Sequence, residues 1–347
     1  MLLGIEIGGT KLQLGVCDQS PETIVELVRT DVDLARGASG ILESIEKQAI
    51  VLARKYPLRH VGIGFGGPID AKHGVVTCSH QVKGWNQFPL ARWCQETLGL
   101  AATMANDCDA AAVAEATYGA GKGSDSVFYV TVGTGVGGGL VLGGKLFGAN
   151  RPAAAEIGHL RPGLHDDRPE LTVESMCAGP AIAAAATARI NGQVSRSLDS
   201  LRKQMAMVGR MSLEKQLENA RQTEAEFLQD LVDRCGGDVD KLTAKQVAQA
   251  AAEGNEVARE VIEHAAVVLG WGVAQVITLL AIETVVIGGG VSMIGETHFF
   301  APLRDSVDRY VFPPLAKTYQ IVPASLGENV VVIGALSIAR DACAKRP

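Results

Sequence analysis

The segment at residues 127–139 (VFYVTVGTGVGGG) constrains the fold more than any other part of this sequence. It begins with the β-branched and aromatic residues typical of a buried strand and ends in a run that contains five glycines. Glycine has no side-chain bulk and tolerates positive φ, so backbone N–H groups in such a run can approach an anion closely. The segment predicts either a phosphate-binding loop or an unliganded hairpin, followed by a tight turn at Gly143-Gly144.

A second glycine-containing turn lies near the start of the chain. Residues 2–7 are apolar and predict a strand, and Gly8-Gly9-Thr10-Lys11 turns the chain back. Thr10 adds a hydroxyl donor, and Glu6 places a carboxylate at the edge of the turn, where a metal-bound water could sit. A third glycine run, Gly288-Gly289-Gly290, follows another apolar segment. Each run alone also fits a plain turn, but together they favour a shared anionic ligand.

Asn106-Asp107 is the most informative pair of side chains. It follows a predicted strand at 101–105 and precedes a helix of small residues. One interpretation is a helix cap, because Asn and Asp commonly fill that position. The other is a functional carboxylate placed at the positive end of the helix dipole. A residue can serve both roles.

A polar segment follows the glycine-rich hairpin. Glu156-Ile157-Gly158-His159 is succeeded by a loop at 165–168 and then by Glu174. These side chains could face a polyhydroxylated ligand, or they could form a solvated loop. Their spacing alone does not separate the two interpretations.

With 347 residues the chain is long enough for two domains, each with its own core. Helices are predicted over 37–55 and 90–98, a largely helical part from 179 to about 280, and a strand at 330–333 before a closing helix. We expect an N-terminal domain over 1–120, on which the helix at about 335–345 packs back. The C-terminal domain is expected over 121–334, with a helical insertion at about 191–236.

Composition excludes several classes of protein. The chain has 347 residues and a net charge of −6, and no cluster of Lys and Arg is long enough to follow a nucleic acid backbone. The seven cysteines are scattered and never occur as C-x-x-C, which is typical of a reducing compartment. The most apolar stretch, 265–287, is interrupted by polar residues and predicts a buried helix followed by a strand. We therefore expect a cytoplasmic protein with no nucleic acid or membrane partner.

Taken together, these segments resemble the ROK family of sugar kinases and repressors, within the sugar kinase–actin–chaperone superfamily. The resemblance spans nearly the whole chain except for the region near 191–236. It implies an α/β, two-domain actin-like/ribonuclease H-like fold, with mixed sheets flanked by helices and an interdomain cleft. The segments that carry it are Ile5-Glu6-Ile7-Gly8-Gly9-Thr10-Lys11, Asn106-Asp107, Gly133-Thr134-Gly135-Val136-Gly137-Gly138-Gly139, Glu156-Ile157-Gly158-His159, Glu174 and Val286-Ile287-Gly288-Gly289-Gly290.

The same resemblance implies an ATP-dependent kinase that acts on a hexose or a hexose derivative, works with Mg²⁺ and forms a homodimer. Asp107 matches the family's catalytic base. The positions implied for the sugar are Gly67, Asn106, Asp107, Glu156, His159 and Glu174. The positions implied for ATP and its metal are Glu6, Gly8, Gly9, Thr10, Lys11, Gly133, Thr134, Gly135, Gly137, Gly288, Gly289 and Gly290.

Three departures from the family pattern affect these expectations. Glu6 stands where the family usually has Asp, and Gln81 where it commonly has Asn. The family's zinc motif places three cysteines between the His and the last Glu, whereas none lies between His159 and Glu174. Tetrahedral zinc needs four ligands, and the intervening His165, Asp166 and Asp167 are a poor match. We expect no structural zinc.

Two alternatives stay open at this point. A ROK repressor would carry an added N-terminal helix-turn-helix, whereas the first predicted strand here begins at Leu2. A non-catalytic sugar sensor, or a kinase for an unusual acceptor, would share most of the same residues.

Overall fold

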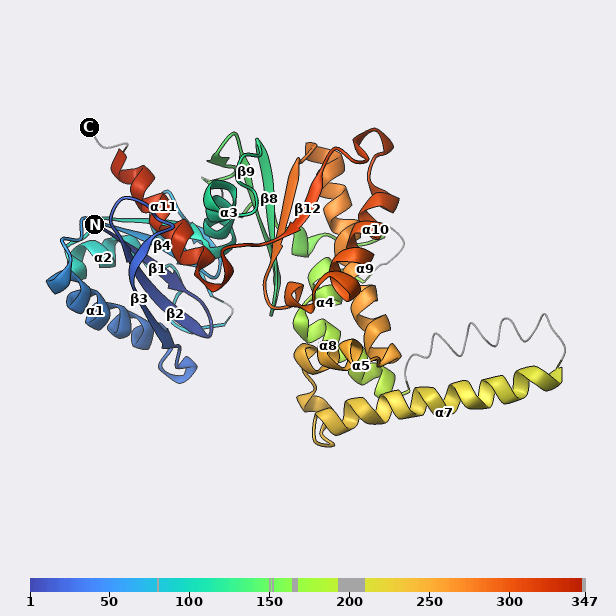
Figure 1. Cartoon of the computed structure of the whole chain (residues 1–347). Coiled ribbons are helices and arrows are strands. Elements are labelled where there is room, and N and C mark those ends of the chain that lie inside the picture. The colour runs from blue at the N-terminus through green and yellow to red at the C-terminus, as the bar shows by residue number, and fades with distance from the viewer. Residues whose placement is uncertain (80, 150, 152, 164–167, 193–209, 345–347) are drawn as a thin grey trace.

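The structure is a computed structural model that describes residues 1–79, 81–149, 151, 153–163, 168–192 and 210–344, with the backbone alone at 210–221. Two five-stranded sheets form the two halves of the molecule (Figure 1). Helices pack on both, which confirms the predicted α/β class. The chain passes from the first sheet to the second at residues 119–125 and returns at residues 324–329. We call these the first and second crossing segments.

The first sheet aligns the ends of three parallel strands. Its order is β3-β2-β1-β4-β7, with β1 antiparallel to β2 and parallel to β4, which is parallel to β7. The register places Ile7, Phe65 and Asn106 side by side. The loops that follow them therefore share one edge of the sheet, where open α/β sheets bind ligands. The strands are β1 (Leu2–Ile7), β2 (Lys11–Cys17), β3 (Ile24–Asp31), β4 (His60–Phe65) and β7 (Ala102–Asn106), with a small pair, β5 (Ile69–Asp70) and β6 (Val75–Val76).

The second sheet follows the same plan. Its order is β10-β9-β8-β11-β12, with β8 antiparallel to β9 and parallel to β11. The turn after β8 and the glycine run after β11 consequently emerge at one edge. Gly143 and Gly144 have φ of 54° and 71° and form the predicted two-residue turn between β9 and β10. The strands are β8 (Ser126–Val132), β9 (Val136–Leu142), β10 (Lys145–Leu146), β11 (Thr284–Gly288) and β12 (Gln320–Pro323).

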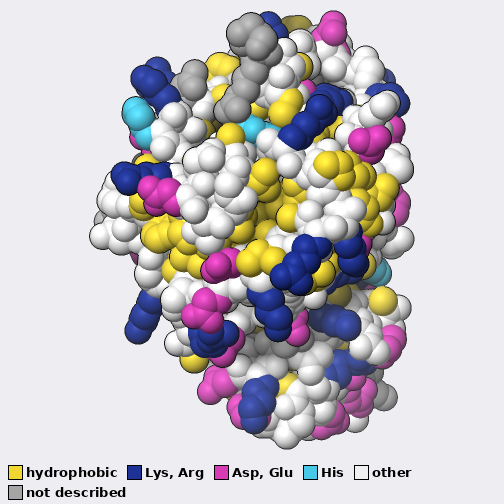
Figure 2. All heavy atoms as spheres, turned by 90° about the vertical axis from the view of Figure 1, so that its left-hand side faces the viewer, with side chains coloured by type: hydrophobic (Ala, Val, Ile, Leu, Met, Phe, Trp, Pro, Cys, Tyr) yellow, Lys and Arg dark blue, Asp and Glu magenta, His cyan; other side chains and the backbone are white. Residues whose placement is uncertain are grey.

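The helices of the first half follow the sequence pattern closely. α1 (Gly37–Lys55) and α2 (Leu90–Leu98) have the predicted bounds. The apolar stripe of α1, which includes Ile41, Ile45 and Leu52, is buried in the hydrophobic core between this helix and the first sheet. On the outer face of this half, apolar side chains gather across the middle, with Lys and Arg interspersed among Asp and Glu (Figure 2). Ile50 and Val51 of α1 are among the exposed apolar side chains.

Two helices lie between the sheets. α11 (Val330–Ala344) packs on β1, β4 and α3 (Asp107–Tyr118), and α3 also packs on β8 and β9. Glycines make this possible: a Cβ on Gly62 would lie 1.8 Å from the Ala335 carbonyl oxygen, and one on Gly334 would lie 1.9 Å from that of Ala110. The predicted strand at 330–333 is wrong, since these residues form the first turn of α11. Burial of their apolar side chains against the sheet outweighs the β propensity of a Val-Val-Val-Ile run.

The second half is mostly helical, as predicted. α9 (Glu256–Leu280) is long and apolar enough to cross a membrane by length and composition alone. Most of it is buried against other helices, however, and β11 follows it, so the predicted buried helix and strand are confirmed. Thr243 and Asn255 cap α8 and α9 as their sequence positions predict. The remaining helices are α4 (Val173–Cys177), α5 (Gly179–Ile190), α7 (Arg210–Arg234), α8 (Ala244–Ala252) and α10 (Ala301–Tyr310).

α7 occupies the predicted helical insertion and extends away from the body of the molecule (Figure 1). Its C-terminal part packs on α5, α8 and α9. Residues 193–209 of the predicted insertion lie outside the described residues. The positions of the two crossing segments support domain boundaries at 1–120 and 121–334, which we propose, with α11 packed on the N-terminal domain.

Candidate active site

Asn106 and Asp107 divide the two roles predicted for them. Asn106 is the N-cap of α3: its side-chain oxygen accepts the Cys108 N–H at 2.8 Å, while its amide donates to the Gly67 carbonyl at 3.2 Å. Asp107 Oδ1 accepts the same Cys108 N–H at 2.9 Å. Its Oδ2 lies beside Gly66, where a Cβ would come within 3.3 Å of it. Asn106 thus caps α3 and also ties the end of β7 to the loop that follows β4.

The Asp107 carboxylate has an unusual environment. Burial raises its pKa to about 6, the Cys108 N–H opposes this rise, and the negative charge of Glu6 adds to it. A carboxylate with a pKa in this range is mostly ionised at neutral pH and is a better proton acceptor than an ordinary aspartate. The side chain therefore suits a general base.

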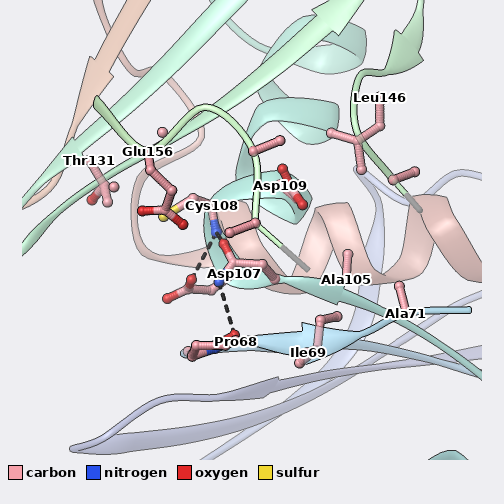
Figure 3. A pocket seen from close by; sticks show the side chains of 18 of the residues that line it. Pro68, Ile69, Ala71, Ala105, Asp107, Cys108, Asp109, Thr131, Leu146 and Glu156 are labelled. Atoms are coloured by element: carbon pink, nitrogen blue, oxygen red, sulfur yellow. Dashed lines mark hydrogen bonds between the residues drawn. The ribbon is translucent and has the colours of Figure 1, made fainter. Parts of the chain in front are cut away.

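Asp107 lines a cavity of about 970 Å³ between the two halves (Figure 3). That volume lies near the upper end of the roughly 300–1,000 Å³ typical of small-molecule sites. Loops from both sheets meet around it, as the shared strand edges require. The cavity brings together these predicted site residues: Gly67, Asn106, Asp107, Gly133, Thr134, Gly135, Gly137, Glu156, His159 and Glu174.

The predicted acceptor cluster is formed at one wall of this cavity. Glu156 precedes the short helix Ile157–His159, and Glu174 lies in α4. Burial raises the pKa of Glu156, the nearby Glu174 adds to the rise, and His159 opposes it. Glu174 Oε2 also accepts the Val136 N–H at 2.8 Å, so it braces the turn between β8 and β9. These side chains are close enough to act on one ligand.

The glycine-rich segment serves two purposes. Only residues 133–135 form the turn between β8 and β9. Gly137 and Gly139 lie in β9, where a Cβ would come within 2.4 Å of Cys108 Sγ and 2.6 Å of the Cys108 carbonyl oxygen, respectively. The absence of bulk at these two positions therefore lets α3 pack on β9. Gly133, Gly135 and Gly137 also line the cavity, so their predicted role in phosphate binding stays a prediction.

The first glycine turn does not itself line the cavity, but it adjoins Gly66 and Gln81, which do. The chain at Gly8 is close to Gly66, and a Cβ on Gly9 would meet the side chain of Gln81. Glu6 is buried and engaged, with its carboxylate 2.6 Å from Gln13 Nε2 and 3.2 Å from Lys11 Nζ. Burial raises the pKa of Glu6, and the charge of Lys11 opposes that rise. Thr10, in contrast, is exposed.

The third glycine run has a clear packing reason. Gly289 has a φ of 87°, and a Cβ there would lie 2.4 Å from the Val132 carbonyl oxygen. Gly288 is buried, and a Cβ there would lie 2.7 Å from the Tyr129 hydroxyl, whereas Gly290 is exposed with open space around it. None of the three lines the cavity that contains Asp107. Their predicted contact with adenosine stays a prediction.

No group of three or more His, Cys, Asp or Glu side chains that could hold a metal ion occurs within the described ranges. His165, Asp166 and Asp167, the weak zinc candidates, lie outside them. The expectation of no structural zinc therefore stays untested.

Sequence analysis missed Asp109, which lines the same cavity (Figure 3). Burial raises its pKa to about 7, and the charges of Asp107 and Glu156 contribute. Its position two residues after Asp107 is the one available signal, because the first turn of a helix that opens onto a cavity presents several side chains to it. Gly66 and Arg151 also line the cavity and were not predicted.

The two sheets have the same strand arrangement, and the cavity between them contains a carboxylate. This is the two-domain actin-like/ribonuclease H-like fold that the resemblance implied. The chain matches the ROK family over residues 2–342 and belongs to that family. It is 28% identical to the glucokinase of Thermotoga maritima over 340 residues, which cover 98% of this chain and 97% of that protein. It is 28% identical to the glucokinase of Streptomyces coelicolor over 359 residues, which cover 98% of each.

Among solved structures, a ROK family glucokinase from Streptomyces griseus in complex with glucose and AMPPNP is similar. It shares 28% sequence identity and a TM-score of 0.77, with 98% of this chain and 99% of that one covered. The predicted family and fold are confirmed.

Proposed function

We propose that this protein is an ATP-dependent sugar kinase that transfers the γ-phosphate of ATP to a hydroxyl of a hexose or hexose derivative. The proposal rests on Asp107, a carboxylate with a raised pKa that lines the cavity between the two sheets, each of which carries a glycine-containing turn. The full-length similarity to glucokinases supports the same activity. The alternative of a non-catalytic sugar sensor has less support, because the full-length relatives named above are glucokinases.

Asp107 accepts the proton of the attacking hydroxyl. Its Oδ1 is oriented by the Cys108 N–H, which leaves Oδ2 beside the backbone of Gly66. Asn106 donates to the Gly67 carbonyl and so fixes the loop that carries Gly66 next to Oδ2. Glu156, His159 and Glu174 bind the other hydroxyls and orient the sugar. Such positioning contributes a large part of the rate enhancement in phosphoryl transfer.

The turns at 8–11 and 133–135 hold the phosphates of ATP through backbone N–H groups other than those of Gly8 and Gly133, which donate within their own turns. Residues 288–290 lie toward the adenosine. Mg²⁺ fits this donor set, because Glu6 and Asp107 are close enough for the charge of one to raise the pKa of the other. When bound, Mg²⁺ neutralises charge on the phosphates. Lys11, which pairs with Glu6, can also reach toward them once that carboxylate is engaged elsewhere.

The same proposal includes a cytoplasmic homodimer. Apolar side chains at the ends of α9 and α10 support self-association: Leu279, Tyr310 and Phe312 are 80%, 47% and 54% exposed. The Phe312 N–H donates to Thr278 Oγ1, which places these two helix ends together. Sedimentation velocity over a range of protein concentrations tests this part independently of catalysis.

The test of activity is a screen of hexoses and hexose derivatives with ATP as donor, run in parallel with inorganic polyphosphate. Formation of a sugar phosphate, and not the consumption of ATP alone, is the measured quantity. We expect at least one hexose to be phosphorylated by the wild type and not by Asp107→Asn. A protein that binds a hexose but transfers phosphate to none would be the sugar sensor instead.

A further inference from the structure

Glu115, in the last turn of α3, is a fully buried carboxylate with only neutral donors around it. Its Oε1 accepts the backbone N–H groups of Ser325 and Leu326, both at 2.9 Å. Its Oε2 accepts the Ala120 N–H at 2.8 Å and the Ser325 hydroxyl at 3.3 Å. No lysine, arginine or histidine forms an ion pair with it in the part of the chain that the structure describes.

These partners belong to both crossing segments. Ala120 lies in the first, between α3 and β8, while Ser325 and Leu326 lie in the second, between β12 and α11. The Glu115 backbone carbonyl also accepts the N–H groups of Gly119 and Gly121, at 3.1 and 3.0 Å. One residue therefore joins the two places where the chain passes between the halves of the molecule.

Placing a negative charge at this position costs free energy. Burial removes water from the carboxylate, and the C-terminal end of a helix carries partial negative charge. Neighbouring residues are nevertheless adapted to it. A Cβ on Gly119 would lie 2.0 Å from Glu115 Oε2 and 2.9 Å from the Ser325 hydroxyl, so only glycine leaves room for the carboxylate there. A buried carboxylate in such a location, beside a glycine that leaves room for it, points to a role beyond filling space.

The arrangement connects Glu115 to the cavity through α3. The opposite end of this helix carries Asp107, and its middle packs on Gly334 of α11. The second crossing segment is in turn tied to the first sheet, because Gln13 Nε2 donates to the Glu328 carbonyl at 3.0 Å and Arg29 pairs with the Glu328 carboxylate at 3.0 Å. We therefore expect a change at Glu115 to alter how the helix that carries Asp107 is held relative to the second half of the molecule, which carries Glu156 and Glu174.

We propose that Glu115 is a positioning residue whose carboxylate couples the two crossing segments, and so fixes Asp107 on one side of the cavity relative to the acceptor side chains on the other. The proposal rests on the proposed kinase function for its catalytic readout, but its structural readout is independent of activity.

The decisive variant is Glu115→Gln. Its carbonyl oxygen can still accept the Ser325 and Leu326 N–H groups, but its amide then faces the Ala120 N–H, donor against donor. The substitution therefore breaks the link between the crossing segments while it preserves shape. Ser325→Ala is the matched control, because it removes only the long hydroxyl contact and leaves the backbone donors in place. Ile45→Ala, in the α1 core, is the control for lost stability without contact to either crossing segment.

We expect Glu115→Gln to lower kcat for the best hexose by on the order of 10-fold or more, because small misplacements of reacting groups are costly. The ratio of ATP hydrolysed to sugar phosphorylated should rise, and KM for ATP should stay within about threefold, since the glycine turns are untouched. Small-angle X-ray scattering should show a larger radius of gyration than for wild type. Ser325→Ala should match wild type in all readouts, and Ile45→Ala should lower only the melting temperature.

The outcomes separate the two proposals. A wild type that phosphorylates no sugar contradicts the proposed function, and the scattering comparison then decides the role of Glu115 alone. Unchanged scattering and an unchanged hydrolysis-to-transfer ratio in Glu115→Gln overturn the positioning role. If that variant does not fold, Gly119→Ala displaces the carboxylate from its other side and is judged by the same measurements.

Discussion

Asp107 carries the sharpest prediction at the level of single residues. Asp107→Asn keeps the shape of the side chain and removes the base. We expect kcat to fall on the order of 10²-fold or more, with hexose affinity within about an order of magnitude of wild type. Steady-state kinetics and calorimetric titration of the sugar provide the two measurements. Near-normal kcat would mean that Asp107 does no more than assist Asn106 in capping α3.

The same residue predicts the pH dependence of turnover. Asp107 works as a base only when ionised, and its pKa is raised to about 6. As the pH falls through that value the active fraction is lost, so kcat should halve near pH 6 and decline about tenfold for each further unit. An ordinary aspartate would keep full activity well below pH 5. A plot of kcat against pH that stays flat down to pH 5 would contradict the assignment.

We expect substitutions in the acceptor cluster to lower kcat/KM for the sugar and to leave KM for ATP nearly unchanged. Glu156→Gln removes the charge that strengthens a hydrogen bond to the sugar, and His159→Ala removes the hydrogen-bonding group itself, each at a cost of about 1.5–3 kcal/mol. That is a loss of roughly 10- to 150-fold in kcat/KM for the sugar, with little change in KM for ATP. Glu174 should behave differently, because it also braces the Val136 N–H. Glu174→Gln retains an oxygen for that bond, whereas Glu174→Ala should weaken ATP binding as well.

At the level of elements, Gly289 predicts a loss of stability. Its φ of 87° and the 2.4 Å approach to the Val132 carbonyl oxygen leave no room for a side chain. Gly289→Ala should lower the free energy of unfolding by about 1–3 kcal/mol, measured by urea denaturation. Gly290→Ala is the matched control, since open space surrounds its Cα, and it should stay within about 0.5 kcal/mol of wild type. Equal effects from the two would show that the end of β11 is not packed on β8 in this way.

Elements with strong local patterns could be predicted from the sequence, and those set by distant contacts could not. α1 has an unbroken apolar stripe, and its bounds follow from it. The run at 330–333 was read as a strand because its local preference is β, while its helical state depends on packing against β1 and β4. β3 went unpredicted because its residues alternate between exposed and partly buried, with no apolar face to mark it.

The candidate site was predictable where chemistry and position coincide. Asn106-Asp107 has both a strand end and a helix start to locate it, and the cavity does contain both. Glycines were harder to interpret, because a residue without a side chain carries the same signal whether a ligand or a helix approaches it. Gly137, Gly139 and Gly289 each have a neighbour within the chain that explains them. Glu115 had no local signal for its role, since Ala120 is its one near partner in the described residues, while Ser325 and Leu326 lie more than 200 positions away.

At the level of the whole molecule, stability should not depend on a metal. A structural zinc would have to hold the loop that carries His159, but no cysteine lies between His159 and Glu174. The core supplies alternative support, because Leu160 is partly buried against the second hydrophobic core and its carbonyl accepts the Val173 N–H at 2.8 Å. Structural zinc normally contributes directly to folding, so its removal would lower the melting temperature.

We expect the purified protein to contain less than stoichiometric zinc by elemental analysis. A chelator should stop turnover without shifting the melting temperature, and Mg²⁺ alone should restore activity. One tightly held zinc per chain, with a melting temperature that falls on chelation, would show that His159 has recruited other ligands.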